Sequence, residues 1–181
     1  MNLLRYLLLC LLPALTACQS GLLVANGDGQ FQPLTATRLV LHEDVRIPPR
    51  QSHVAFQRGS REPGAGEFAP HCELEVRQVL EEAQTVRAGV FEITKILGVT
   101  HYVQRGIHSI RLAAGDDFQL LADDSSEWIM MAYHFTLRSD DQPDVTRLLC
   151  GGAYNYPYFA RYPSIEDMRL ALGDVATIVM Q

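Results

Sequence analysis

Hydrophobic and polar residues alternate along several segments after Thr37, with the period of two that is typical of half-buried strands. The clearest segment runs from Trp128 to Leu137. It places these residues on one face: Ile129, Met131, Tyr133, Phe135 and Leu137. The segment 37–47 places Leu39, Leu41, Val45 and Ile47 on one face in the same way. Further strands are expected at 53–57, 72–80, 90–97, 100–104, 107–112, 145–150 and 175–180, the strand at 145–150 being buried on both faces.

One segment near the C-terminus has the pattern of a helix instead. Ser164 is a suitable N-cap and acidic residues follow it in the first turn. Ile165, Met168 and Leu172 share one face, and Gly173 suits the position after the helix. Short strands with Gly- and Pro-containing turns, such as 59–70, predict a mainly β fold. We expect an antiparallel β-sandwich or barrel-like domain with one C-terminal α-helix.

The first seventeen residues form a different pattern, with one early positive charge, Arg5, and then an apolar run that ends in small residues. This layout is typical of a secretory signal peptide. The run is too short to span a bilayer core of about 30 Å as a mature helix. A short membrane anchor and a buried helix are the alternative interpretations.

Leu15-Thr16-Ala17-Cys18 follows that run directly. It resembles the lipobox of bacterial lipoproteins, and the resemblance covers the first eighteen residues only. It implies cleavage before Cys18, a diacylglyceryl group on the Cys18 sulfur, and an acyl chain such as palmitate on the new amino terminus. Several acyl chains anchor a protein stably where one does not. Gln19 at the next position resembles members sorted to the outer membrane.

These patterns predict three regions: a lipoprotein signal peptide at 1–17, a lipidated cysteine with a flexible tether at 18–30, and a single β-rich domain at 31–181 that faces the periplasm of a Gram-negative bacterium. Gly21, Gly27 and Gly29 indicate the low stiffness of the tether. Its apolar residues Leu22-Leu23-Val24 either lie on the membrane surface or dock on the domain.

Charge narrows the class of partner. The chain of 181 residues has 15 Lys and Arg against 21 Asp and Glu, a formal net charge of −6. Nucleic-acid binding needs clustered basic residues, so we do not expect a nucleic-acid partner. The expected contacts are with the membrane, through the lipid, and with an envelope protein.

Two cysteines of the expected mature domain, Cys72 and Cys150, have no role in lipidation. An even pair in an oxidising compartment predicts a disulfide. The chain-entropy model gives such a closed loop about 4.5 kcal/mol of stabilisation. The alternative is a catalytic thiol at Cys150, beside the backbone amides of Gly151 and Gly152.

Histidines and acidic doublets give no recognisable metal signature. No two histidines have the H-x-x-x-H spacing and no CxxC occurs, so we expect no metal and no cofactor beyond the lipid. Histidines from separate strands would still form a site if His71, His101, His108 or His134 converged. The doublets Asp116-Asp117, Asp123-Asp124 and Asp140-Asp141 lie beside turn-forming residues and are typical of solvated turns. Motifs of serine hydrolases, P-loops and dinucleotide sites are absent from the sequence, and no catalytic residue is predicted.

The segment from Tyr154 to Pro163 is rich in aromatic residues and is interrupted by proline. Tyrosine and arginine combine apolar area with hydrogen-bonding ends, which suits an interface or the stacking of sugars. The other interpretation is that these aromatics cover the edge of the core. The candidate partner-binding residues are Tyr154, Tyr156, Tyr158, Phe159, Arg161 and Tyr162.

Together these observations favour a non-catalytic lipoprotein of the cell envelope that binds a protein or an envelope polymer. Two alternatives stay open. One is an anchored hydrolase or metal-dependent enzyme that acts on envelope material, and the other is a structural component of a secretion or surface-assembly apparatus.

Overall fold

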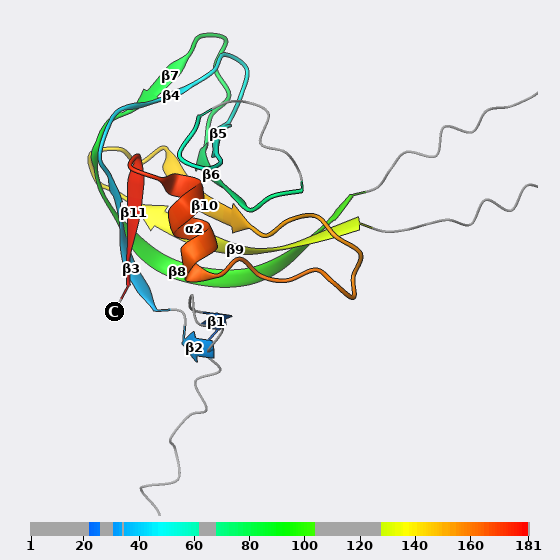
Figure 1. Ribbon diagram of the computed structural model, residues 1–181. Helices are drawn as coiled ribbons and strands as arrows, with labels where there is room; N and C mark the ends of the chain where they lie inside the picture. The colour runs from blue at the N-terminus through cyan, green and yellow to red at the C-terminus, as the bar shows by residue number, and fades with distance from the viewer. Residues whose placement is uncertain (1–21, 26–30, 34, 62–67, 104–127, 181) are drawn as a thin grey trace, which may run out of the picture.

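A computed structural model describes residues 22–25, 31–33, 35–61, 68–103 and 128–180. Its main element is an antiparallel sheet of seven strands in the order β11-β3-β8-β9-β10-β6-β5 (Figure 1). These strands are β3 (Ala36–Leu41), β5 (His53–Phe56), β6 (His71–Val76), β8 (Gly89–Val103), β9 (Trp128–Arg138), β10 (Val145–Gly151) and β11 (Ala176–Met180). Two small sheets pair β1 (Leu23–Ala25) with β2 (Phe31–Pro33) and β4 (Val45–Ile47) with β7 (Gln84–Val86).

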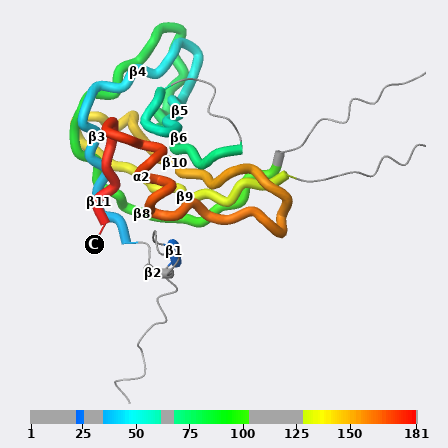
Figure 2. Tube along the Cα trace, in the orientation of Figure 1, coloured from blue at the N-terminus to red at the C-terminus, as the bar shows by residue number. Residues whose placement is uncertain are grey.

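The main sheet curls into a half-barrel around the helix α2 (Ile165–Leu172), as the tube in Figure 2 also shows. The helix contacts both β11, at one edge of the sheet, and β6, next to the other edge. Met168 and Leu172 of α2 are buried in the same core as Tyr133 and Phe135 of β9. The expected mainly β, antiparallel barrel-like fold with one C-terminal helix is therefore confirmed. No helix within the described ranges combines the length and apolar character needed to cross a bilayer.

The predicted alternation holds at most core positions, because a strand buries every second side chain. Leu39, Leu41, Val45 and Ile47 are all buried, but the segment expected as one strand is divided between β3 and β4. The chain turns at 42–44, and β4 joins a separate two-stranded sheet.

Strands expected separately at 90–97 and 100–104 form the single strand β8, so that prediction is wrong. Gly98 does not end the strand. A Cβ atom built there would lie 2.7 Å from the Tyr162 hydroxyl, so this glycine makes room for a tyrosine packed on the sheet. The strand expected at 107–112 lies outside the described residues.

The helix prediction is confirmed at both ends. Ser164 accepts a hydrogen bond from the Asp167 amide, and the Asp167 side chain accepts one from the Ser164 amide, which forms a capping box. Gly173 follows the last helical residue with a positive φ of 55°. The amide of Gly59 donates to the Ala171 carbonyl at 3.0 Å, so the loop after β5 holds the end of the helix.

Apolar residues of the segment expected as a tether pack on the domain. Val24 is buried in the main core, and the Tyr133 hydroxyl donates to the Leu23 carbonyl at 2.7 Å. Of the two alternatives for this segment, docking on the domain is the one observed. The folded unit therefore takes in part of the range 18–30.

The opposite face of the sheet carries a second, smaller apolar cluster. Met130 and Ala132 of β9 and Leu149 of β10 are buried there, with Val99 and Tyr154 packed against them. Leu148 and Cys150 of β10 belong to the main core. The expectation that this strand is buried on both faces is confirmed.

Candidate functional site

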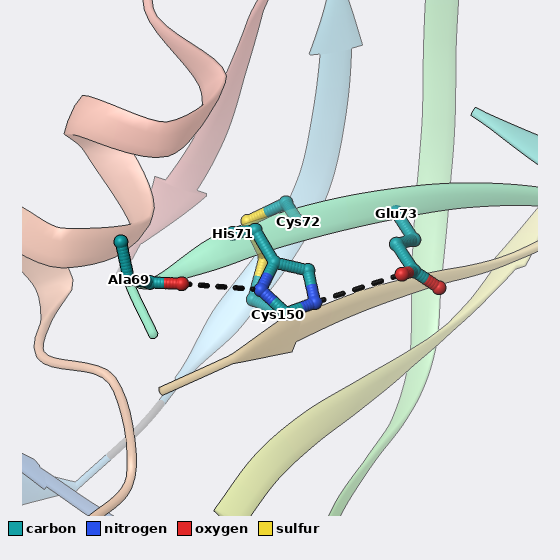
Figure 3. Close-up of a disulfide and its surroundings, with 5 residues drawn as sticks. All are labelled: Ala69, His71, Cys72, Glu73 and Cys150. Carbon is teal, nitrogen blue, oxygen red and sulfur yellow. Dashed lines mark hydrogen bonds and ion pairs between the residues drawn. A yellow bond between two sulfur atoms is a disulfide. The ribbon is translucent and has the colours of Figure 1, made fainter. Parts of the chain in front are cut away.

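Cys72 and Cys150 form a disulfide between adjacent strands (Figure 3). They lie directly opposite each other in the register of β6 and β10, with Cα atoms 4.1 Å apart, and both are fully buried. Antiparallel pairing brings opposed residues this close, so the sheet itself brings the two sulfurs together. The predicted disulfide is confirmed, and the alternative of a free catalytic thiol at Cys150 is wrong for this structure.

His71 lies beside the disulfide but takes part in different contacts (Figure 3). The ring is buried, with Nδ1 3.2 Å from the Ala69 carbonyl and Nε2 3.5 Å from a carboxylate oxygen of Glu73. The hydrogen bond from His71 lowers the pKa of Glu73 below its usual value, although burial acts in the opposite direction. Because both ring nitrogens face partners within the fold, we interpret His71 as a structural residue.

From β8 to β6, a row of polar side chains crosses the face of the sheet that carries the smaller apolar cluster, which is also the face of His71 and Glu73. The Nε2 atoms of His101 and His134 are 3.2 Å apart, and Nδ1 of His134 is 3.3 Å from Nη1 of Arg147. Arg147 in turn donates to Glu75 through Nε at 2.8 Å and through Nη2. Burial and then the charge of Arg147 lower the pKa of His134, which favours its neutral form. Of the four histidines named above, His101 and His134 converge and His108 lies outside the described residues.

The aromatic segment is divided between side chains that pack on the domain and side chains that face solvent. Tyr154 packs on the smaller cluster, and Tyr162 stacks on Tyr133 with ring centroids 4.7 Å apart. Burial of Tyr133 and its proximity to Tyr162 raise its pKa to about 12. Between these two ends, Tyr158 is 98% exposed and Phe159 is 71% exposed. The ends cover the core, and the middle of the segment faces solvent.

Backbone contacts hold the segment in place at its base. Asn155 and Ile129 exchange two backbone hydrogen bonds, and the amide of Gly152 donates to the Met131 carbonyl. A Cβ atom at Gly152 would collide with the Arg161 carbonyl oxygen, so the two ends of the loop approach closely only because residue 152 is glycine. The exposed aromatics are therefore presented by an anchored loop.

Two further aromatic residues join this surface, and the sequence alone did not indicate them. Trp128 contacts Phe68 edge to face at 5.2 Å and Tyr156 at 5.0 Å between ring centroids. Phe68 is 61% exposed. The aromatic surface is defined here as Phe68, Trp128, Tyr156, Tyr158 and Phe159. Phe68 comes from a loop before β6 and Trp128 from the start of β9, so no local pattern links them to the segment 154–163.

The remaining candidate residues fall in three groups. Arg161 is exposed at the end of the aromatic segment. Asp140 and Asp141 lie in the turn between β9 and β10, as expected for a solvated doublet. Cys18 and the doublets at 116–117 and 123–124 lie outside the described residues. Within the described ranges, no group of three or more His, Cys, Asp or Glu side chains is arranged to hold a metal ion.

Comparisons with protein-family models, with curated proteins and with solved structures find nothing that matches this chain.

Proposed function

We propose that this chain is a lipid-anchored protein of the cell envelope that acts by binding, and that its aromatic surface is the contact site for a protein partner. The observation that carries the proposal is the exposure of Tyr158 and Phe159 on a loop whose two ends are held by packing and backbone hydrogen bonds. Large aromatic side chains at the centre of an interface commonly supply most of its binding free energy.

The architecture supports binding by a preformed surface. Tyr154 and Tyr162 immobilise the segment, so little conformational entropy is lost when Tyr158 and Phe159 dock on a partner. Arg161 lies exposed at the end of the segment, where a polar group can form the rim of an interface.

The proposed anchor is the lipid on Cys18, inferred from the lipobox-like segment. It would hold the domain at the periplasmic face of the outer membrane, where oxidising conditions favour the disulfide. Cys18→Ser should abolish globomycin-sensitive processing and release the protein from the membrane fraction. Normal processing and membrane retention of that variant would refute lipidation.

The partner is tested by cross-linking in intact cells. A photoreactive phenylalanine at position 158 should capture an envelope protein, and Tyr158→Ser combined with Phe159→Ser should reduce capture by a neighbouring probe at position 156 at least tenfold. The thermal midpoint of unfolding should hardly change, because both side chains are exposed.

Leu170→Ser is the matched control, since Leu170 is also an exposed apolar residue but lies on α2. Equal capture by the double variant and the wild type would contradict the proposed surface. Co-sedimentation with purified peptidoglycan that depends on Tyr158 and Phe159 would instead assign the surface to an envelope polymer.

One observation favours a second function, an anchored hydrolase or metal-dependent enzyme that acts on envelope material. His101 and His134 converge from different strands, as that alternative requires. Hydrolysis of envelope polymers by the purified full chain, lost in His134→Gln, would establish it. Unchanged polymers after prolonged incubation would leave binding as the function.

A further inference from the structure

We propose that His101 and His134 form a binding site for a transition-metal ion that prefers imidazole, such as Zn²⁺, Ni²⁺ or Cu²⁺. The site is independent of the aromatic surface and does not require partner binding. Imidazole nitrogen is a preferred ligand of these ions.

The distance between the two rings fits a shared ion. Zinc binds imidazole nitrogen at about 2.0–2.1 Å, so two Nε2 atoms 3.2 Å apart would subtend about 100–105° at one ion. That angle lies between the values for octahedral and tetrahedral coordination. Water would complete the coordination, because both side chains are only partly buried.

The sheet brings the two residues together from distant parts of the chain. His134 lies opposite Leu97 in the register of β8 and β9, and His101 lies opposite Met130. Val99 and Ala132 form the pair between them, so the two rings reach toward each other along the strands over this pair. A bound ion would thus join the end of β8 near Val103 to the part of β9 that pairs with β10.

The charges around the pair act in opposite directions. Glu73 and Glu75 contribute negative charge that favours a cation, and Glu75 also pairs with the guanidinium of Arg147. Arg147 itself opposes metal binding. Its Nη1 faces Nδ1 of His134, the atom that must carry the proton when Nε2 binds a metal. Histidine ligands normally donate that proton to a carbonyl or carboxylate.

The unfavourable contact of the Arg147 guanidinium with Nδ1–H of His134 makes it possible to distinguish a metal site from a simple hydrogen bond between two neutral rings. Arg147→Gln replaces the guanidinium with an amide whose oxygen can accept from Nδ1–H. We therefore expect Arg147→Gln to tighten Zn²⁺ binding about tenfold, within the range by which outer contacts change metal affinity. If the rings only share a hydrogen bond, this substitution has no effect on metal affinity.

The experiment is calorimetric titration of the full chain, purified in detergent without an affinity tag, with Zn²⁺ alone. His101→Ala and His134→Gln should each weaken binding at least tenfold. His42 is exposed and contacts Thr177 on β11, so His42→Ala is the control and should leave binding unchanged. Zn²⁺ binding that persists in the double variant His101→Ala with His134→Gln comes from other sites and is subtracted from every titration. Nitrogen-15 NMR of the imidazole rings should show Zn²⁺ on Nε2 of both residues, with the proton of His134 on Nδ1.

Besides an unchanged metal affinity in Arg147→Gln, two results would overturn the proposal. One is wild-type affinity for Zn²⁺, Ni²⁺ and Cu²⁺ in His101→Ala. The other is an absence of any ring response to these ions in the wild type. Near-ultraviolet circular dichroism of each metal-free variant identifies loss of folding, and His101→Phe then replaces any unfolded alanine variant.

Discussion

Glu73 and His71 show how a polar pair is maintained beside the buried disulfide. His71 is held between the Ala69 carbonyl and the Glu73 carboxylate, while its neighbour Cys72 points into the core. Alternation along β6 accounts for these opposite directions and was predictable from the sequence. The contact of Glu73 with His71 was not predicted, because it depends on which side-chain conformations the neighbouring strands allow.

This pair predicts an acid-dependent loss of stability. The pKa of Glu73 is lower in the folded protein than in the unfolded chain, so its stabilising contribution is present above the unfolded value of about 4.3. That contribution is lost as the pH falls through the folded pKa. Glu73→Gln should therefore flatten the decline in the free energy of unfolding below pH 5. Urea unfolding at several pH values from 7 to 3 measures this. A decline as steep as in the wild type would show that other carboxylates cause it.

At the scale of elements, α2 closes the open side of the curled sheet. The capping box and the amphipathic pattern made this helix predictable from its own residues. Its place between β6 and β11 was not, since it depends on how far the sheet curls. The same limit explains the error at Gly98, where a glycine typical of a strand end accommodates Tyr162 from a distant segment.

The end of the helix gives a second prediction. A Cβ atom at Gly173 would lie 2.5 Å from the Gly59 Cα, and the positive φ of Gly173 already disfavours other residues. Gly173→Ala should lower the free energy of unfolding by about 2 kcal/mol. Gly89→Ala is the control, because its Cβ would meet its nearest atom at an ordinary 3.7 Å. Equal stability of the two variants in urea unfolding would contradict the contact.

At the scale of the whole molecule, the disulfide joins β6 and β10 across 78 residues of sequence. Between these two cysteines the chain forms β8 and β9, which lie at the centre of the sheet. The bond therefore restricts a large part of the unfolded chain.

Removal of this bond should have a large effect on stability. Cys72→Ala with Cys150→Ala should cost about 2–5 kcal/mol of unfolding free energy, measured by urea denaturation. A reducing agent should destabilise the wild type to a similar extent and leave the double variant unchanged. A loss below about 1 kcal/mol would contradict this prediction, because the bond would then restrict the unfolded chain very little.

The sequence by itself determined the features that depend on neighbouring residues. Alternation of apolar residues predicted most strands and their buried faces, and local caps predicted the helix. The pair of cysteines without a role in lipidation predicted the disulfide. The tertiary structure decided which distant residues meet. Only the register of β8 and β9 brings His101 to His134, and only the packing of a loop and a strand brings Phe68 and Trp128 to Tyr156. Such contacts depend on the curl and register of the sheet, which no short segment of sequence specifies.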